Sequence, residues 1–321
     1  ALAEGCDPTF PDEVLAEARH HADHPALDEP GLVDLEHVPF VTVDGPTAKD
    51  LDQALHVEDD GATFRVRYAL ADAAHVAMPG SALLAEALAR GASYYLPGLA
   101  IPMLPRILSE GQTSLNPGVP RRALVFDMRV DRAGTCLGTE VVRARIVSRH
   151  KLAFADVQQL YDDPTRSPLA SDPCAASLRA LREVGLVLMN ELASRDVVRY
   201  RRREVEVRLA GEGGLGFVVV EGLRDEVELF NEQLSLLCNR EAAAPHIQPI
   251  YRVHPPPDPR RVSGLERTLG GLATRRALPS VFAWRPGRGQ SLAQYLHALP
   301  EGGPHERVTR AIHRQAILTN L

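Results

Sequence analysis

A short apolar segment followed by a dense group of aspartates, at residues 40–53, constrains the fold of this chain more than any other stretch. Residues 40–43 read Phe-Val-Thr-Val, which predicts a buried strand, and Asp44 closes that strand before a Gly-Pro pair interrupts regular structure. Asp50 and Asp52 lie two positions apart, so their carboxylates point the same way in an extended or looped backbone. The segment therefore predicts three carboxylates gathered at the end of one strand.

Such a group of carboxylates indicates a metal site. Three negative charges that converge beside a buried strand repel one another unless a cation lies between them. Hard oxygen ligands with no His or Cys nearby suit Mg²⁺ or Mn²⁺ better than Zn²⁺, and the spacing does not match the twelve-residue calcium loop. A solvated acidic loop explains the same residues, so the residues alone leave both interpretations open.

The composition narrows the possible partners and compartments. The 321 residues are enough for one large domain or two. The net charge of −6 excludes a protein that coats nucleic acid with its whole surface, but it allows a confined basic groove. The four cysteines match no disulfide or metal spacing, and no apolar run is long enough to cross a bilayer. We therefore expect a cytoplasmic protein in a reducing compartment.

Hydrophobic periodicity predicts the elements along the rest of the chain. Residues 63–72 alternate apolar and polar side chains, as a half-buried strand does, and Ser81 and Gly91 delimit a short helix. Four prolines between positions 97 and 117 exclude a long helix and predict a rigid surface loop over 93–120. We expect helices at 10–19, 152–162, 173–198, 225–243 and around 260, 292 and 306, strands at 122–130 and 136–148, and a hairpin of strands at 204–210 and 216–221.

A basic group near residue 145 is the best candidate for contacts to phosphates. Arg143 and Arg145 share one face of the predicted strand at 136–148, and Lys151 follows shortly after it. Each contact between such a side chain and a phosphate adds salt-sensitive affinity for nucleic acid. A solvated strand face explains the pattern equally well.

The order of these features resembles one family, the ribonuclease II (RNB) exoribonucleases. Residues 43–54, Val-Asp-Gly-Pro-Thr-Ala-Lys-Asp-Leu-Asp-Gln-Ala, are similar to the family's signature of a strand ending in Asp followed by further aspartates. Four further similar motifs follow in the family's order: residues 71–73 with 79–81, a proline-rich loop made of 94–98, 101–105 and 114–115, a helix at 232–239 and a segment at 251–254. Five motifs in the correct order make the resemblance specific.

The resemblance implies an α+β fold of the RNB type, in which helices surround a mixed β-sheet and enclose a narrow RNA channel. It implies a monomeric, metal-dependent enzyme that hydrolyses single-stranded RNA processively from the 3′ end to nucleoside 5′-monophosphates. Asp44, Asp50 and Asp52 then hold Mg²⁺ or Mn²⁺ and are catalytic together with Tyr95, which packs against the RNA near its 3′ end. Arg143, Arg145 and Lys151 complete the expected RNA-binding residues.

The chain departs from the family's pattern at Gln53, where the signature has a fourth acidic residue. An amide oxygen can coordinate Mg²⁺ but brings no charge, so we expect Gln53 to be a weak metal ligand. A catalytically weakened RNB-domain protein that binds RNA is therefore the alternative function. A phosphatase or an endonuclease that uses the same carboxylates is a more distant one.

We expect a lead-in segment over 1–39 and the catalytic domain over 40–321. The family's pattern continues beyond Leu321 into an Arg-containing motif, and its flanking RNA-binding barrels are not recognisable here, as expected of a segment of a longer protein. Four further residues remain secondary candidates. Glu232 and Asn239 are expected to fix helix packing, and His75 and His254 to be structural. For Asp72, two roles stay open, facing the acidic site or capping the next turn.

Overall fold

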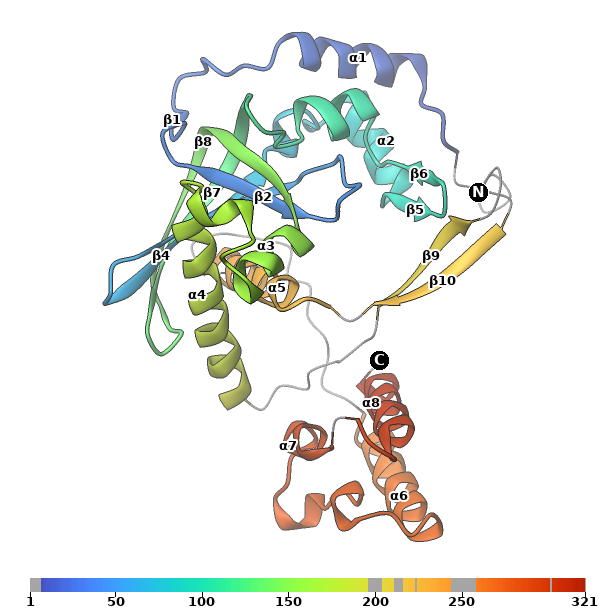
Figure 1. Ribbon diagram of the computed structural model, residues 1–321. Coiled ribbons are helices and arrows are strands. Elements are labelled where there is room, and N and C mark those ends of the chain that lie inside the picture. The colour runs from blue at the N-terminus through green and yellow to red at the C-terminus, as the bar shows by residue number, and fades with distance from the viewer. Residues whose placement is uncertain are drawn as a thin grey trace. The chain divides into compact units, whose positions relative to one another are not determined.

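The computed structural model describes residues 7–195, 204–210, 216–222, 224–243, 258–300 and 302–320 (Figure 1). The chain divides into two compact units. The first comprises Ala1–Met189 with Glu204–Ala242, and the second comprises Asn190–Arg203 with Ala243–Leu321. Within the described residues, no helix combines the length and the apolar composition needed to cross a membrane.

A six-stranded mixed sheet forms the centre of the first unit, in the order β1-β8-β2-β3-β4-β7. Strand β8 runs parallel to β1 and β2, and all other neighbours are antiparallel. The first part of β8 pairs with β7 and its last part pairs with β2, so the strand pairing closes on itself. The strands are β1 (Val33–Asp34), β2 (Phe40–Asp44), β3 (Gln53–Asp59), β4 (Thr63–Ala71), β7 (Pro120–Asp131) and β8 (Cys136–Ala153).

Both faces of this sheet are buried. Successive side chains of a strand point to opposite faces, so the neighbours Phe40 and Val41 belong to two different apolar clusters. The cluster around Val41 includes Phe230 and Leu181 from the helices that cover one face (Figure 1). Those helices are α3 (Phe154–Asp162), α4 (Ala175–Ser194) and α5 (Glu226–Ala242).

Smaller elements complete the first unit. Helices α1 (Asp12–Asp23) and α2 (Ala82–Arg90) pack together, and a π-helical turn spans Ile107–Gln112. Two separate hairpins also belong to this unit. One pairs β5 (Tyr94–Leu96) with β6 (Leu99–Ile101), and the other pairs β9 (Glu204–Ala210) with β10 (Gly216–Gly222). Gly98 turns the first hairpin with a φ of +74°, and a Cβ at this position would collide with the side chain of Leu209 in β9.

The second unit is helical in its described part. It contains α6 (Pro259–Arg275), α7 (Leu292–Ala298) and α8 (Glu306–Asn320). Its core includes Phe282, Trp284 and Tyr295, and the Tyr295 hydroxyl donates a hydrogen bond to the Phe282 carbonyl at 2.8 Å.

The predicted α+β class, with helices around a mixed sheet, is confirmed. The helix between Ser81 and Gly91 forms as predicted, since the Ser81 hydroxyl accepts a hydrogen bond from the Leu84 amide and Gly91 is left-handed. The segment at 93–120, predicted as a rigid surface loop without a long helix, contains the short strands β5 and β6 and the π-helical turn, which were not predicted. The division into a lead-in over 1–39 and a domain over 40–321 stays a prediction.

Candidate functional site

The acidic loop, defined as residues 44–53, joins the end of β2 to the start of the antiparallel strand β3. Leu51 anchors this loop, since its side chain is 1% exposed and its amide donates to the Ser114 hydroxyl at 3.0 Å. Ser114, itself buried, donates in turn to the Lys49 carbonyl at 2.8 Å. Because Leu51 points into the core, the aspartates on either side of it are turned away from the core.

The carboxylates of the acidic loop interact with one another. Burial raises the pKa of Asp44, and the charge of Asp50 raises it further, against the hydrogen bond from the Gly45 amide and the charge of Lys151. Asp52 has an exposed surface, but the protein around its carboxylate removes part of its hydration, and this desolvation raises its pKa. The charges of Asp44 and Asp50 raise it further. The negative charges of the three carboxylates therefore act on one another, and a bound cation would relieve this repulsion. Their joint role as metal ligands stays a prediction.

These donors fit a hard divalent ion such as Mg²⁺, because all of them are carboxylate oxygens. In the described part of the chain, the carboxylate oxygens of Asp44, Asp50 and Asp52 do not all lie within 4.8 Å of one another. An ion about 2.1 Å from each oxygen requires those oxygens to lie within about 4 Å of each other. Binding of a single ion to all three aspartates therefore requires the loop to contract.

Gln53 is held by a neighbouring strand. Its amide oxygen accepts a short hydrogen bond from the hydroxyl of Tyr68, a residue of β4 that is 1% exposed. Burial strongly raises the pKa of Tyr68, so the hydroxyl remains a donor at neutral pH. One lone pair of the Gln53 oxygen is thus already engaged, and its role as a metal ligand stays a prediction.

Tyr95 reaches the acidic loop from β5. Its hydroxyl donates a short hydrogen bond to the Asp50 carboxylate, while 67% of the residue is exposed. Burial of the hydroxyl and its bond to Asp50 raise the pKa of Tyr95 to about 12. The structure therefore places an accessible aromatic ring beside the carboxylates, although Tyr95 lies 45 positions after Asp50 in the sequence.

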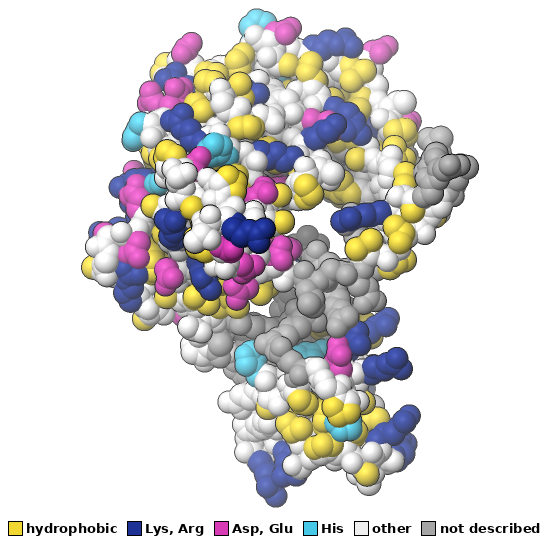
Figure 2. Space-filling view, in the orientation of Figure 1, with side chains coloured by type: hydrophobic (Ala, Val, Ile, Leu, Met, Phe, Trp, Pro, Cys, Tyr) yellow, Lys and Arg dark blue, Asp and Glu magenta, His cyan; other side chains and the backbone are white. Residues whose placement is uncertain are grey.

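The predicted basic residues have different surroundings. The Lys151 ammonium donates to the carbonyls of Ala48 and Pro46, the latter at 3.2 Å, so it braces the acidic loop. Arg145 forms ion pairs with carboxylates that include Asp34 at 3.0 Å, whereas Arg143 is exposed. On the face shown in Figure 2, basic and acidic side chains of the first unit are interspersed. A role of these three residues in RNA binding stays a prediction.

The secondary candidates that are described have different surroundings. Asp72 is the N-cap residue of the turn at Ala73–His75, but its side chain makes no capping hydrogen bond and pairs with buried Arg122 at 3.3 Å. That Asp72 faces the acidic site stays a prediction. Glu232 accepts a hydrogen bond from Arg224 at 2.7 Å, and Asn239 is exposed at the surface of α5. His254 lies outside the described residues.

One group of side chains was missed by sequence reasoning. His150, Asp172 and Cys174 bring their potential ligand atoms within 4.8 Å of one another. Their separation in the sequence fits no metal-binding motif, and the pairing of β8 with the rest of the sheet brings His150 to the start of α4. No local signal identifies such a group.

Comparisons with known proteins identify the family. The family model for the RNB domain matches residues 32–318. Ribonuclease R of Mycoplasmopsis pulmonis is 31% identical over 283 residues, which cover 85% of this chain and 38% of that protein. The chain spans about a third of the length of the curated relatives it matches.

Solved structures agree on the fold. Mycoplasma genitalium RNase R in complex with double-stranded RNA superimposes with a TM-score of 0.82 at 23% identity, covering 97% of this chain and 55% of that one. Yeast Ssd1, described as a pseudonuclease, superimposes with a TM-score of 0.62 at 11% identity, covering 92% and 35%. The resemblance seen in the order of motifs is confirmed by the match over 32–318, and this chain belongs to the RNB domain family.

Proposed function

We propose that this chain is the catalytic part of a metal-dependent 3′-to-5′ exoribonuclease that hydrolyses single-stranded RNA processively to nucleoside 5′-monophosphates. The observation that carries the proposal is the acidic loop, in which three interacting carboxylates lie beside the exposed ring of Tyr95. Membership of the RNB family and the relatives named Ribonuclease R support it. A monomeric state, a cytoplasmic location and a narrow RNA channel stay predictions.

Asp44, Asp50 and Asp52 would hold the divalent ion, with Gln53 beside them. Bound there, Mg²⁺ or Mn²⁺ would supply a Lewis acid for the scissile phosphate and a water of lowered pKa. Asp50 orients the Tyr95 hydroxyl, which leaves the aromatic face free to stack on a base of any identity.

The surrounding residues hold the carboxylates in place. Buried Leu51 fixes the part of the loop between Asp50 and Asp52, and Lys151 fixes the part between Asp44 and Asp50 through two backbone carbonyls. Both supports come from the ordered sheet, directly or through the core. The loop is therefore positioned before substrate binds, which lowers the cost of orienting the reacting groups.

A catalytically weakened RNA-binding protein is the second candidate, because Gln53 brings no charge and shares its oxygen with Tyr68. The fold itself does not decide between the two, since it also occurs in a protein described as a pseudonuclease. Only a test of cleavage separates them.

The experiment uses single-stranded RNA labelled at its 5′ end, with and without Mg²⁺. We expect a ladder of progressively shorter labelled products and release of mononucleotides, both abolished by EDTA. Asp52→Asn should lower the rate more than about 100-fold, because even residues that only support metal ligands contribute about 10- to 100-fold. Asp23→Asn, at an exposed position at the end of α1, is the matched control and should retain the wild-type rate.

The products distinguish the candidates. RNA binding without cleavage by the full-length protein that contains this chain would favour the weakened protein, and internal fragments would favour an endonuclease. Cleavage that Asp52→Asn leaves unchanged would refute the assignment of the acidic loop as the site.

A further inference from the structure

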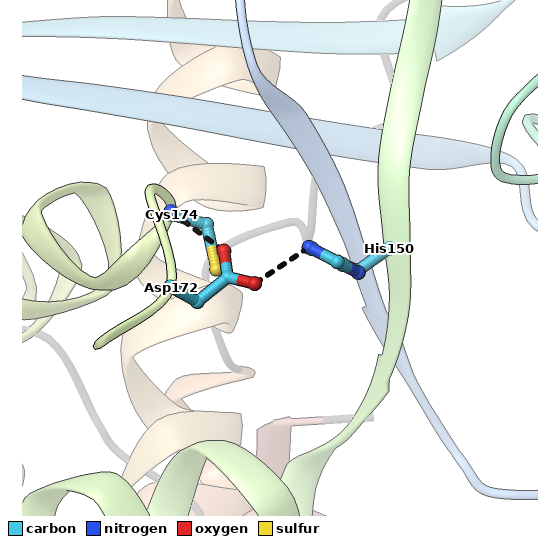
Figure 3. A group of neighbouring side chains, drawn as sticks. All are labelled: His150, Asp172 and Cys174. Atoms are coloured by element: carbon cyan, nitrogen blue, oxygen red, sulfur yellow. Dashed lines mark hydrogen bonds and ion pairs between the residues drawn. The ribbon is translucent and has the colours of Figure 1, made fainter. Parts of the chain in front are cut away.

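A second group of potential metal ligands lies where β8 meets the start of α4. Figure 3 shows His150 reaching from β8 towards the carboxylate of Asp172, with the sulfur of Cys174 beside the same carboxylate. The ligand atoms of all three lie within 4.8 Å of one another, and no other group of three among the described residues meets this condition. The group contains one nitrogen, one oxygen and one sulfur ligand.

The three side chains are held by ordered backbone. The Nε2 atom of His150 lies 3.0 Å from a carboxylate oxygen of Asp172, and the other oxygen accepts the Cys174 amide at 2.9 Å. The Asp172 carbonyl accepts the Ala175 amide at 2.9 Å, which begins α4. The Thr42 hydroxyl donates to the His150 carbonyl at 3.3 Å, which links this end of β8 to β2. Ligands on such elements need little reorganisation to meet one ion.

We propose that His150, Asp172 and Cys174 bind a Zn²⁺ ion, or a first-row transition metal of similar preference, with solvent in the fourth position. A thiolate and an imidazole select such an ion over Mg²⁺, which prefers oxygen ligands. Three protein ligands with one open position form a common zinc site. Cys174 is 1% exposed, whereas the His150 side chain is 40% exposed, so the group is closed on the sulfur side and open on the imidazole side.

Binding exchanges the thiol proton for the metal. In the absence of metal the Cys174 thiol keeps its proton beside the Asp172 carboxylate. When the sulfur–metal bond forms, this proton leaves to solvent, and the carboxylate is freed to coordinate the same ion. Nothing is oxidised or reduced.

A catalytic cysteine is the first alternative, and the contacts oppose it. A nucleophilic cysteine needs surroundings that lower the pKa of its thiol, such as a neighbouring positive charge. Here the group beside the sulfur is the Asp172 carboxylate, and burial together with that carboxylate raises the pKa of Cys174 to about 12. The thiol is therefore unreactive at neutral pH.

A purely structural cap is the second alternative, since Asp172 already bonds to the Cys174 amide at the start of α4. A cap of this kind needs neither the imidazole nor the sulfur. The two possibilities therefore differ in whether the chain takes up a metal that contacts the thiolate.

The test is a titration of the metal-free chain with Co²⁺, a spectroscopic substitute for Zn²⁺, in millimolar Mg²⁺ to occupy the acidic loop. A thiolate bound to Co²⁺ gives a near-ultraviolet charge-transfer band, which carboxylates alone cannot give. We expect the band to saturate at one equivalent, to disappear in Cys174→Ser, and to need at least about 10-fold more Co²⁺ in His150→Ala. Cys136→Ser, at a half-buried thiol elsewhere in β8, and Cys6→Ser are the matched controls and should retain the band.

Thermal unfolding gives an independent measurement. Zn²⁺ should raise the midpoint of the wild-type chain and leave that of Cys174→Ser unchanged, because a ligand that binds only the folded state stabilises it. If Cys174→Ser does not fold, His150→Ala serves in its place, since the imidazole is partly exposed. Absence of the band in the wild-type chain, or its persistence in Cys174→Ser, would overturn the proposal. Neither result depends on ribonuclease activity.

Discussion

Replacing Tyr95 by Ala and, separately, by Phe distinguishes the two contributions that this residue can make to the site. Tyr95→Ala removes the exposed ring and the hydroxyl together. Tyr95→Phe keeps the ring and removes only the hydrogen bond to Asp50. If the ring stacks on RNA, the two variants must differ in their affinity for RNA.

The expected magnitudes follow from the exposure of the side chain. Stacking of one base on an aromatic ring contributes about 1–3 kcal/mol, so Tyr95→Ala should raise the Kd for RNA by about 5- to 150-fold. A hydrogen bond to a charged acceptor contributes about 1.5–3 kcal/mol when buried, but Tyr95 is 67% exposed and water can replace its hydroxyl. Tyr95→Phe should therefore bind RNA within about 3-fold of the wild-type chain.

Fluorescence anisotropy with a labelled single-stranded RNA, in EDTA to prevent turnover, measures both affinities. Because tyrosine is uncharged, neither variant should change the slope of log Kd against log salt concentration, which reports contacts to phosphates. Equal affinity of Tyr95→Ala and the wild-type chain would refute stacking. A Phe variant as weak as the Ala variant would show that the bond to Asp50 is what matters.

Three further outcomes are expected. Gln53→Asp should lower the Mg²⁺ concentration at half-maximal activity, because it adds a charge to the acidic loop while its oxygen can still accept from Tyr68; an equal half-saturation would contradict this. Leu51→Ala should reduce the free energy of unfolding in urea by about 2–5 kcal/mol, since the side chain is 1% exposed. Asp127→Asn should flatten the loss of stability in acid. Burial raises the pKa of Asp127, but the hydrogen bond and charge of Arg65 outweigh burial, so the pKa of Asp127 in the folded state is lowered. The ionised carboxylate therefore stabilises the folded state above its unfolded pKa of about 4, and this stabilisation is lost as the pH falls through the folded pKa.

Local rules account for the elements that were predicted correctly. A hydroxyl cap and a left-handed glycine act within a few residues, so Ser81 and Gly91 define α2 without reference to the rest of the fold. The helix predicted over 225–243 forms as α5, and its side chains Val227 and Phe230 are 0% and 2% exposed, because helical periodicity brings apolar residues to the side that faces the core.

Elements whose environment is set by tertiary contacts were not predicted. Strand β3 is buried on both faces through residues 54–57, including His56, so it lacks the alternation that marks a half-exposed strand. The hairpin of β5 and β6 lies at the start of a proline-rich sequence, and its turn needs a glycine at position 98. In both cases the residues are compatible with a strand, but only the packing selects it.

The same distinction applies to the candidate site. The acidic residues are close together in the sequence, so the pattern alone predicts that they gather, and neighbouring charges contribute to the raised pKa values of Asp44 and Asp52. What orients them comes from distant segments: Ser114 fixes the backbone at Leu51, Lys151 fixes the carbonyl of Ala48, and Tyr95 fixes Asp50. Each support forms hydrogen bonds that no spacing rule encodes.

The supports of the loop leave most of its negative charge uncompensated. Lys151 donates to two backbone carbonyls of the loop, and its positive charge lowers the pKa of Asp44. Tyr95 and Tyr68 are neutral donors, so they satisfy single oxygens of Asp50 and Gln53 and leave the net negative charge intact. A divalent cation would balance the remaining charge once the carboxylate oxygens move closer together, as the proposed function requires.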